Sequence, residues 1–187
     1  MKELIKRNLI GKKILIFFVL TGIIYGIMLG ITGPKVMSMA GGMRILDLMP
    51  TGYDAVYVNT LFDALGAEGR STYLFNQLPL DLIFPLLSGI SFCLIMAWFL
   101  SKYGKLETNW FYLCYLPVFA GLSDYLENFG IIAMISSYPH ISVGLIKTTS
   151  LFTLLKSSIT TLYFIILIIM LILYGKNIFP QKKKSIR

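Results

Sequence analysis

The sequence is poor in charged residues and in the side chains that most often form catalytic and metal sites. Only 14% of its 187 residues are charged, against about 25% in an average soluble domain. It contains no H-E-x-x-H, no G-x-S-x-G, no P-loop and no zinc-site spacing of Cys and His. These absences argue against a soluble domain and against enzymes built on those motifs, and we expect no metal and no cofactor.

The few cysteine and histidine residues have ordinary structural interpretations. Cys93 and Cys114 are too few for a disulfide framework, lack C-x-x-C spacing, and sit in apolar runs, where cysteine packs as a small apolar residue. This disfavours a quinone-linked thiol oxidoreductase. The single histidine, His140, follows Pro139 in an expected loop, and we interpret it as a solvated residue.

Apolar residues, in contrast, are abundant and occur in long runs. Hydrophobic residues make up 56% of the chain, and the mean hydropathy is +0.75. Four runs reach the roughly 20 residues that cross a bilayer core of about 30 Å: 14–32, 82–100, 110–135 and 151–174. We therefore predict an all-α polytopic membrane protein, a single domain over 1–187 whose four transmembrane helices form an antiparallel bundle.

The net charge of +8 follows the pattern of a membrane protein. Basic residues gather before the first run, between the second and third, and after the fourth. Since the number of spans is even, these regions share one side, which the positive-inside rule assigns to the cytoplasm. We expect a multi-pass protein of the plasma (inner) membrane with both termini cytoplasmic, a basic tail over 175–187, and no nucleic-acid partner.

The first span carries two further signals. The basic start and Ser38-Met39-Ala40 imitate a cleaved signal peptide, but the apolar run is too long and ends well before Ala40, so we expect a retained span. Gly33-Pro34 is expected to end its helix, because proline lacks a backbone donor. Three glycines at four-residue spacing share one helix face that allows close packing: Gly22, Gly26 and Gly30. Their partner is either another helix of this chain, which we favour, or a second copy or partner subunit.

The longest stretch outside the spans, 33–81, is expected to face outward. Thr51 and Asp54 fit a capping box that would start a helix, and Gly66 is its expected stop. A second short helix, about 69–78, should lead into span two with a bend near Pro79. We expect these to be amphipathic helices that lie on the outer membrane surface as a lid. An extended linker is the alternative, which the aromatic content of the segment disfavours.

The most informative cluster is Asp124-Tyr-Leu-Glu-Asn128, in the middle of the third run. Two carboxylates and an amide within two helical turns are costly in hydrocarbon and by default mark a functional site. Asp124, Glu127 and Asn128 share one helix face with small residues such as Gly121. The alternative is that these side chains only hold helices together through hydrogen bonds.

Two other spans carry matching polar stripes. Span four has a lysine among hydroxyl residues, and span two begins with an amide and an acid; the stripes are Thr149, Thr153, Lys156, Ser157 and Thr160, and Gln77, Asp81, Pro85 and Ser88. We expect Lys156 to form an intramembrane ion pair with Glu127. The three stripes together predict a polar cavity that opens outward beneath the lid.

Charge within this cavity is unbalanced. If Asp81, Asp124 and Glu127 are all ionised, Lys156 alone leaves a buried negative charge, which is costly. Three compensations are open: a carboxyl that stays protonated, Arg70 folding in from the lid, or a bound cation. A neutral carboxyl beside an ionised one is a usual acid/base arrangement.

Several phrases resemble signatures of a family of small four-span bacterial membrane proteins to which no activity is attached: Met49-Pro-Thr-Gly-Tyr53, Leu65-Gly-Ala-Glu-Gly-Arg70, Asp81-x-x-x-Pro85 and Asp124-Tyr-Leu-Glu-Asn128. The layout is also similar to that of the emopamil-binding (EXPERA) proteins, which have four spans, an acidic outward segment, intramembrane acids and a basic C-terminal tail. In that group the acids line a sterol-type ligand pocket and can serve isomerisation. The similarity lies in layout alone, so it implies no residue role here.

These observations predict a pocket for a membrane lipid or amphipathic small molecule, formed by Asp81, Asp124, Glu127, Asn128, Lys156 and Arg70. Whether it is an enzyme stays open; if it is, Asp124 and Glu127 handle the proton, Asn128 orients the ligand and Lys156 tunes the acids. One alternative is a small ion- or proton-coupled carrier whose acids bind a cation. Another is a non-catalytic membrane subunit that assembles through the glycine face of span one.

Overall fold

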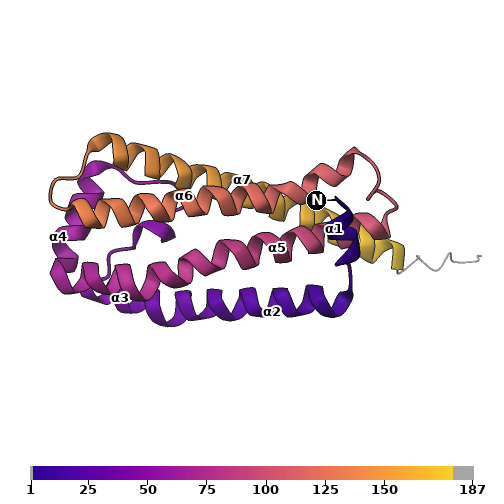
Figure 1. Ribbon diagram of the computed structural model, residues 1–187, viewed down its shortest axis with the longest axis horizontal. Coiled ribbons are helices and arrows are strands. Elements are labelled where there is room, and N and C mark those ends of the chain that lie inside the picture. Colours follow the sequence, from indigo (N-terminus) through magenta and orange to yellow (C-terminus); the bar gives the residue numbers. More distant parts are fainter. Residues whose placement is uncertain (1, 179–187) are drawn as a thin grey trace, which may run out of the picture.

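A computed structural model describes residues 2–178, and helices account for nearly all of this range, without a strand. Four helical stretches are long and apolar enough to cross a membrane, which confirms the predicted all-helical class. Figure 1 shows their main helices side by side along the long axis: α2 (Gly11–Ile27), α5 (Leu78–Lys102), α6 (Leu116–Ser137) and α7 (Val143–Ile178). Helix α5 packs between α2 and α6, and α6 packs against α7.

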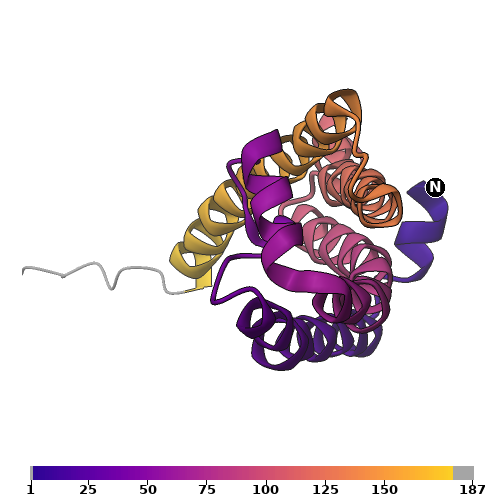
Figure 2. The same cartoon turned by 90° about the vertical axis from the view of Figure 1, so that its left-hand side faces the viewer.

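Shorter elements occupy the two ends of this arrangement. One end carries α1 (Lys2–Arg7) and the 3₁₀ segment η4 (Asn109–Tyr115). The other end carries α3 (Gly33–Met39), the 3₁₀ turn η2 (Leu46–Leu48) and α4 (Ala55–Thr72). Figure 2, which faces this second end, shows α4 lying across the ends of the long helices. We call the two ends the α1 end and the α4 end.

The prediction that Gly33-Pro34 ends the first helix is wrong. The chain passes through a π-helical turn, η1 (Met28–Thr32), and continues as α3 to Met39. The wider turn accommodates Pro34, which lacks a backbone donor. Gly33 closes the turn by donating its N–H to the Met28 carbonyl, and a Cβ at position 33 would lie 2.7 Å from that oxygen.

Helix α4 follows the expected pattern with one difference at its start. Asp54, and not Thr51, caps the helix, because its Oδ1 accepts the Tyr57 N–H at 2.8 Å. Gly66 interrupts the helix with a φ of 60°, as its sequence context indicated. The chain then runs through a second π-helical turn, η3 (Tyr73–Gln77), into α5, whose first turn contains Pro79. One face of α4 is buried: Val58, Leu61, Phe62 and Leu65.

The last helix begins earlier than its apolar run. Helix α7 starts at Val143, where Ser142 Oγ accepts the Leu145 N–H at 3.1 Å. The connection from α6 is therefore shorter than the interval between the third and fourth apolar runs. Thr149 and Ser150 are therefore helical residues. The predicted basic tail lies mostly outside the described residues.

Two apolar cores fill the interior, one toward each end. The core at the α4 end includes Val36, Phe62, Tyr73 and Ile131, and the core at the α1 end includes Met96, Phe111 and Tyr163. Between the two cores, the interior faces of α5, α6 and α7 carry a group of buried polar side chains. The opposite face of α6 is exposed, as expected for a lipid-facing surface: Phe119, Leu122, Leu126 and Phe129.

The glycine face of α2 does not pack within the chain. Gly22, Gly26 and Gly30 are exposed, and an added Cβ at each would meet nothing within 4 Å. The favoured interpretation, close packing against another helix of the same chain, is therefore wrong. Helix α2 contacts α5 through other residues, such as Tyr25, whose ring stacks on Phe84.

Candidate functional site

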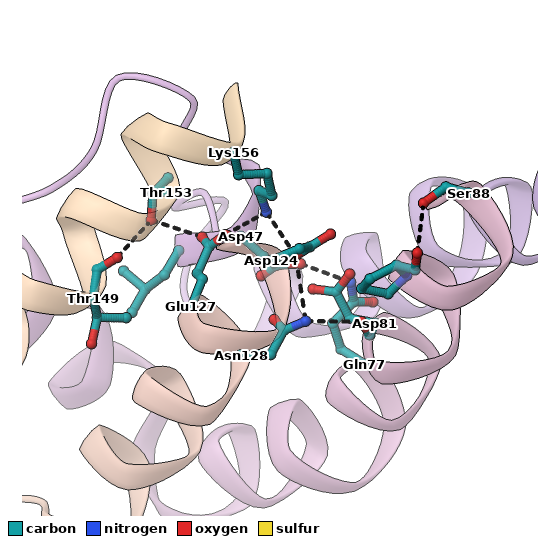
Figure 3. Close-up of polar contacts among 12 residues, drawn as sticks. Asp47, Gln77, Asp81, Ser88, Asp124, Glu127, Asn128, Thr149, Thr153 and Lys156 are labelled. Carbon is teal, nitrogen blue, oxygen red and sulfur yellow. Dashed lines mark hydrogen bonds and ion pairs between the residues drawn. The ribbon is translucent and has the colours of Figure 1, made fainter. Parts of the chain in front are cut away.

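The polar side chains between the two cores converge from three helices (Figure 3). Their sequence spacing follows the helical repeat, so each helix presents its polar stripe on one face toward the others. We call the central five residues the polar cluster: Asp81 from α5, Asp124, Glu127 and Asn128 from α6, and Lys156 from α7. Glu127 and Asn128 are 0% exposed and Asp81 and Asp124 are nearly so.

Lys156 connects α7 to both acids of α6. Its Nζ lies 2.5 Å from Glu127 Oε2 and 3.1 Å from Asp124 Oδ1. The predicted Lys156–Glu127 ion pair is confirmed, and the contact with Asp124 extends it. Thr153, one turn before Lys156, donates its hydroxyl to Glu127 Oε1 at 2.8 Å. Glu127 is thus held from α7 by a cation and a hydroxyl.

Asn128 connects α6 to α5. Its Nδ2 donates to the Asp81 carbonyl oxygen at 2.8 Å and lies 3.4 Å from Asp124 Oδ1. Two acceptors nearby have no hydrogen-bond partner among the described residues, Asp81 Oδ2 and Asn128 Oδ1. Buried acceptors without donors are unusual and costly. The cluster is therefore short of hydrogen-bond donors and of positive charge.

A second polar group adjoins the cluster and was not assigned to the site from the sequence. Asp47 Oδ1 accepts the Tyr73 hydroxyl at 2.5 Å, and Asp47 Oδ2 accepts from Gln77 Nε2 at 2.9 Å. Gln77 Oε1 in turn accepts the Thr32 hydroxyl. Figure 3 shows Asp47 beside the acids of the cluster. No local pattern marks Asp47, because it follows a loop and belongs to a single 3₁₀ turn.

Arg70 does not join the site. Its Nη1 donates to the Phe62 carbonyl at 2.6 Å, and its guanidinium lies 4.1 Å from the centre of the Tyr138 ring. The break at Gly66 redirects the last part of α4. Arg70 therefore contacts Phe62 in the first part of the same helix and Tyr138 at the end of α6. Of the three open compensations, the folding in of Arg70 is therefore not observed, and the assignment of Arg70 to the site is wrong.

Two open grooves lie at the α4 end, with volumes of about 470 and 600 Å³. Both are lined by Tyr53, Asp54, Val56 and Ser150, and neither is lined by a residue of the polar cluster. Neither groove therefore opens directly onto the acids, as the expected outward-opening cavity would. The acids are buried, and Tyr53 lines both grooves.

Tyr53 lies between the grooves and the cluster. Its phenol oxygen is buried, lies beside Thr153, and makes no hydrogen bond to a described residue. Burial is the main reason that the pKa of Tyr53 is raised above its ordinary value. Tyr53 lines both grooves and lies beside Thr153, and Thr153 donates a hydrogen bond to Glu127. This series of contacts connects the grooves to the buried acids.

Within the described residues, no group of three or more His, Cys, Asp or Glu side chains is arranged to hold a metal ion. The arrangement can instead bind a proton, or a ligand group that donates hydrogen bonds. Comparisons with protein-family models, with curated proteins and with solved structures found no match to this chain.

Proposed function

We propose that this protein binds a membrane lipid or other amphipathic small molecule in an intramembrane pocket that centres on the polar cluster. The observation that carries the proposal is the burial of Asp81, Asp124 and Glu127 against a single ammonium between long apolar helices. Apolar residues would hold these helices together at least as well as an ion pair. Unbalanced buried acids are therefore better explained as a site than as helix contacts.

The proposed membrane placement is an antiparallel four-helix bundle in the plasma membrane, with both termini cytoplasmic and the α4 end outside. The order of helix contacts along the chain supports the bundle. Lys102 ends α5 and Lys105 follows it, at the end that carries α1 and its basic residues, Lys2 and Lys6, which supports the orientation. In this placement α4 is the amphipathic helix on the outer surface.

The ligand chemistry follows from the unsatisfied atoms. Asp81 Oδ2 and Asn128 Oδ1 are acceptors, so a complementary head group donates hydrogen bonds, as a hydroxyl or an amine does. The smaller groove offers an apolar surface for a chain: Val56, Val143, Ile146, Leu151 and Leu154. Acid/base chemistry on the bound molecule would use Asp124 and Glu127, with Asn128 orienting the head group.

The test is the thermal stability of the detergent-purified protein with three probes of equal chain length: a fatty alcohol, a fatty amine and a fatty acid. We expect the alcohol or amine to raise the melting temperature and the acid to have no effect. The rise should disappear in Asp124→Asn and Glu127→Gln, and it should persist in Glu68→Gln, which changes an exposed acid of α4. Equal effects of all three probes in every variant would refute the pocket.

A second candidate is a proton- or ion-coupled carrier. The excess of carboxylates over ammonium groups favours it, because a bound proton or cation would relieve the buried charge. In liposomes with an internal pH dye, a carrier would move protons across the membrane, and Asp81→Asn would stop this movement. If liposomes with wild-type protein admit protons no faster than protein-free liposomes, the carrier is excluded.

A third candidate is a membrane subunit that assembles through α2. The open space over Gly22, Gly26 and Gly30 favours it, since such a face allows close approach of another helix. Gly26→Ile should then abolish association with a second copy or partner subunit. Unchanged co-purification in mild detergent would exclude it.

A further inference from the structure

One loop covers the polar cluster at the α4 end. Residues 43–54, which we call the strap, leave the end of α3, pass through η2 and enter α4. Two glycines with positive φ bend the chain here: Gly42, at 89°, immediately precedes the strap, and Gly52, at 77°, lies near its end. At these two positions the backbone adopts a conformation that other residues rarely take, so each is a defined corner.

The strap is fastened to α7 at its second corner. The Tyr53 N–H donates to Ser150 Oγ at 2.9 Å. An added Cβ at Gly52 would lie 2.7 Å from the same oxygen, so the strap backbone rests directly on the helix. The Tyr53 phenol lies beside Thr153, one helical turn further along α7 toward Lys156.

The strap is fastened a second time near its middle. Asp47 accepts hydrogen bonds from Tyr73 and Gln77, which belong to the turn η3. This contact also brings a carboxylate toward the acids of the polar cluster (Figure 3). Carboxylates repel one another more strongly in a buried site. The hydrogen bonds from Tyr73 and Gln77 therefore hold Asp47 in place against repulsion from the acids of the cluster.

Tyr53 fills the passage that the strap covers. It lines both grooves, and its buried phenol oxygen has no partner among the described residues. A buried phenol without a hydrogen bond contributes little to stability, because it has lost its hydrogen bonds to water without replacing them. The backbone contacts of the strap, and not the phenol, therefore hold Tyr53 in place. Moving Tyr53 outward would expose Thr153, and behind it Glu127 and Lys156, to the grooves.

We propose that the strap is the gate of the pocket and that Tyr53 is the residue that separates the grooves from the polar cluster. Closing requires the Asp47 contacts with Tyr73 and Gln77 and the Tyr53 contact with Ser150. The inference rests on the proposed function, since it gives that pocket its entrance. The ligand enters through the grooves, and its head group passes the place of the Tyr53 phenol beside Thr153 to reach the polar cluster.

Thiol labelling tests the gate without any ligand. The reporter is Thr153→Cys in full-length protein in which Cys93 and Cys114 are replaced by alanine, treated with a small water-soluble maleimide. We expect slow labelling with the native strap and labelling about tenfold faster or more with Tyr53→Ala, because the rate follows the open population. Asp47→Ala should act in the same direction by removing both acceptors of the second fastening.

Two controls make the result specific to Tyr53. Thr60→Ala changes an exposed residue of α4 that lines only the larger groove and donates to the Val56 carbonyl of its own helix, and it should leave the labelling rate unchanged. A Lys147→Cys reporter, in the smaller groove, should react quickly in every variant. If Tyr53→Ala does not fold, Tyr53→Leu makes the same test.

The gate is refuted if Thr153→Cys stays protected in folded Tyr53→Ala or Tyr53→Leu protein. It is also refuted if Thr60→Ala accelerates labelling equally. Failure of the proposed function is separate, since it would appear as an absence of stabilisation by the alcohol and the amine, whatever the labelling rates.

Discussion

The ammonium of Lys156 lies 2.5 Å from Glu127 Oε2, with the lysine side chain only 17% exposed and the glutamate fully buried. The pair joins α6 and α7 between the two apolar cores. Since each charge replaces the water that the other would need, the pair behaves as one unit. Removing one member is therefore more harmful than removing both.

Lys156→Met should destabilise the protein by about 3–5 kcal/mol, because it leaves Glu127 and Asp124 buried without a cation. The double variant Lys156→Met with Glu127→Gln should recover part of this loss. Thermal or denaturant unfolding in detergent measures both, and Lys147→Met, at an exposed position of the same helix, is the control. A Lys156→Met protein as stable as wild type would contradict the ion pair.

Gly130→Ala should separate α6 from α7. A Cβ at position 130 would overlap Thr149 Oγ1 and lie 2.6 Å from Cγ2 and 2.9 Å from Cβ of the same residue. Neither helix can therefore yield without moving its backbone. We expect a loss of about 1–3 kcal/mol, typical of overpacking. Gly26→Ala, which meets nothing within 4 Å, is the matched control and should not destabilise the monomer. Equal unfolding midpoints for the two variants would show that the helices are not in close contact here.

Asp54→Ala should destabilise the start of α4 by about 1 kcal/mol, the usual effect of losing a helix cap. Thr51→Ala should have little effect, although the sequence indicated Thr51 as the cap. Hydrogen exchange of the first turn of α4 distinguishes the two. Faster exchange in Thr51→Ala than in Asp54→Ala would contradict the observed cap.

The contact between α1 and the loop before η4 should depend on pH. Hydrogen bonds from Lys2 and Lys6 hold the pKa of Glu107 below its ordinary value, and Glu3 also pairs with Lys6. A carboxyl with a lowered folded-state pKa stabilises above its unfolded pKa, and the contribution is lost as pH falls through the folded value. We therefore expect the contact to persist at neutral pH and to weaken below about pH 4.

Spin labels at Leu4→Cys and Asn109→Cys, in protein lacking the native cysteines, report this contact as a distance. The distance should lengthen or broaden on acidification, and Glu107→Gln should show the low-pH distribution at neutral pH. A Glu107→Gln distribution identical to that of wild type would show that Ile5, which is buried, holds α1 in place without the ion pairs.

Much of the candidate site follows from helical periodicity. Glu127 and Asn128 follow Asp124 by three and four residues, which places all three on one face. The opposite face carries the exposed Phe119, Leu122, Leu126 and Phe129. The ion pair between Lys156 and Glu127 also follows, because apolar runs offer buried charges few other partners. Such inferences depend only on local geometry, which the order of residues determines.

The residues that close the site do not follow from any local pattern. Asp47 and Tyr53 lie outside regular α-helices, and their positions depend on where α7 and the turn η3 offer Ser150, Tyr73 and Gln77. Arg70 turned to Phe62 and Tyr138 because Gly66 redirects its helix.

The sequence by itself determined the number of long helices, their apolar and polar faces, and the presence of acids among them, since these depend on hydrophobicity and helical repeat. Only the tertiary structure decided that the helical path of α2 continues through η1 and α3 past Pro34, that Gly22, Gly26 and Gly30 face outward, and that a strap covers the acids. Those features depend on contacts between residues far apart in the chain, such as Tyr53 with Ser150 and Asp47 with Gln77, which no local spacing encodes.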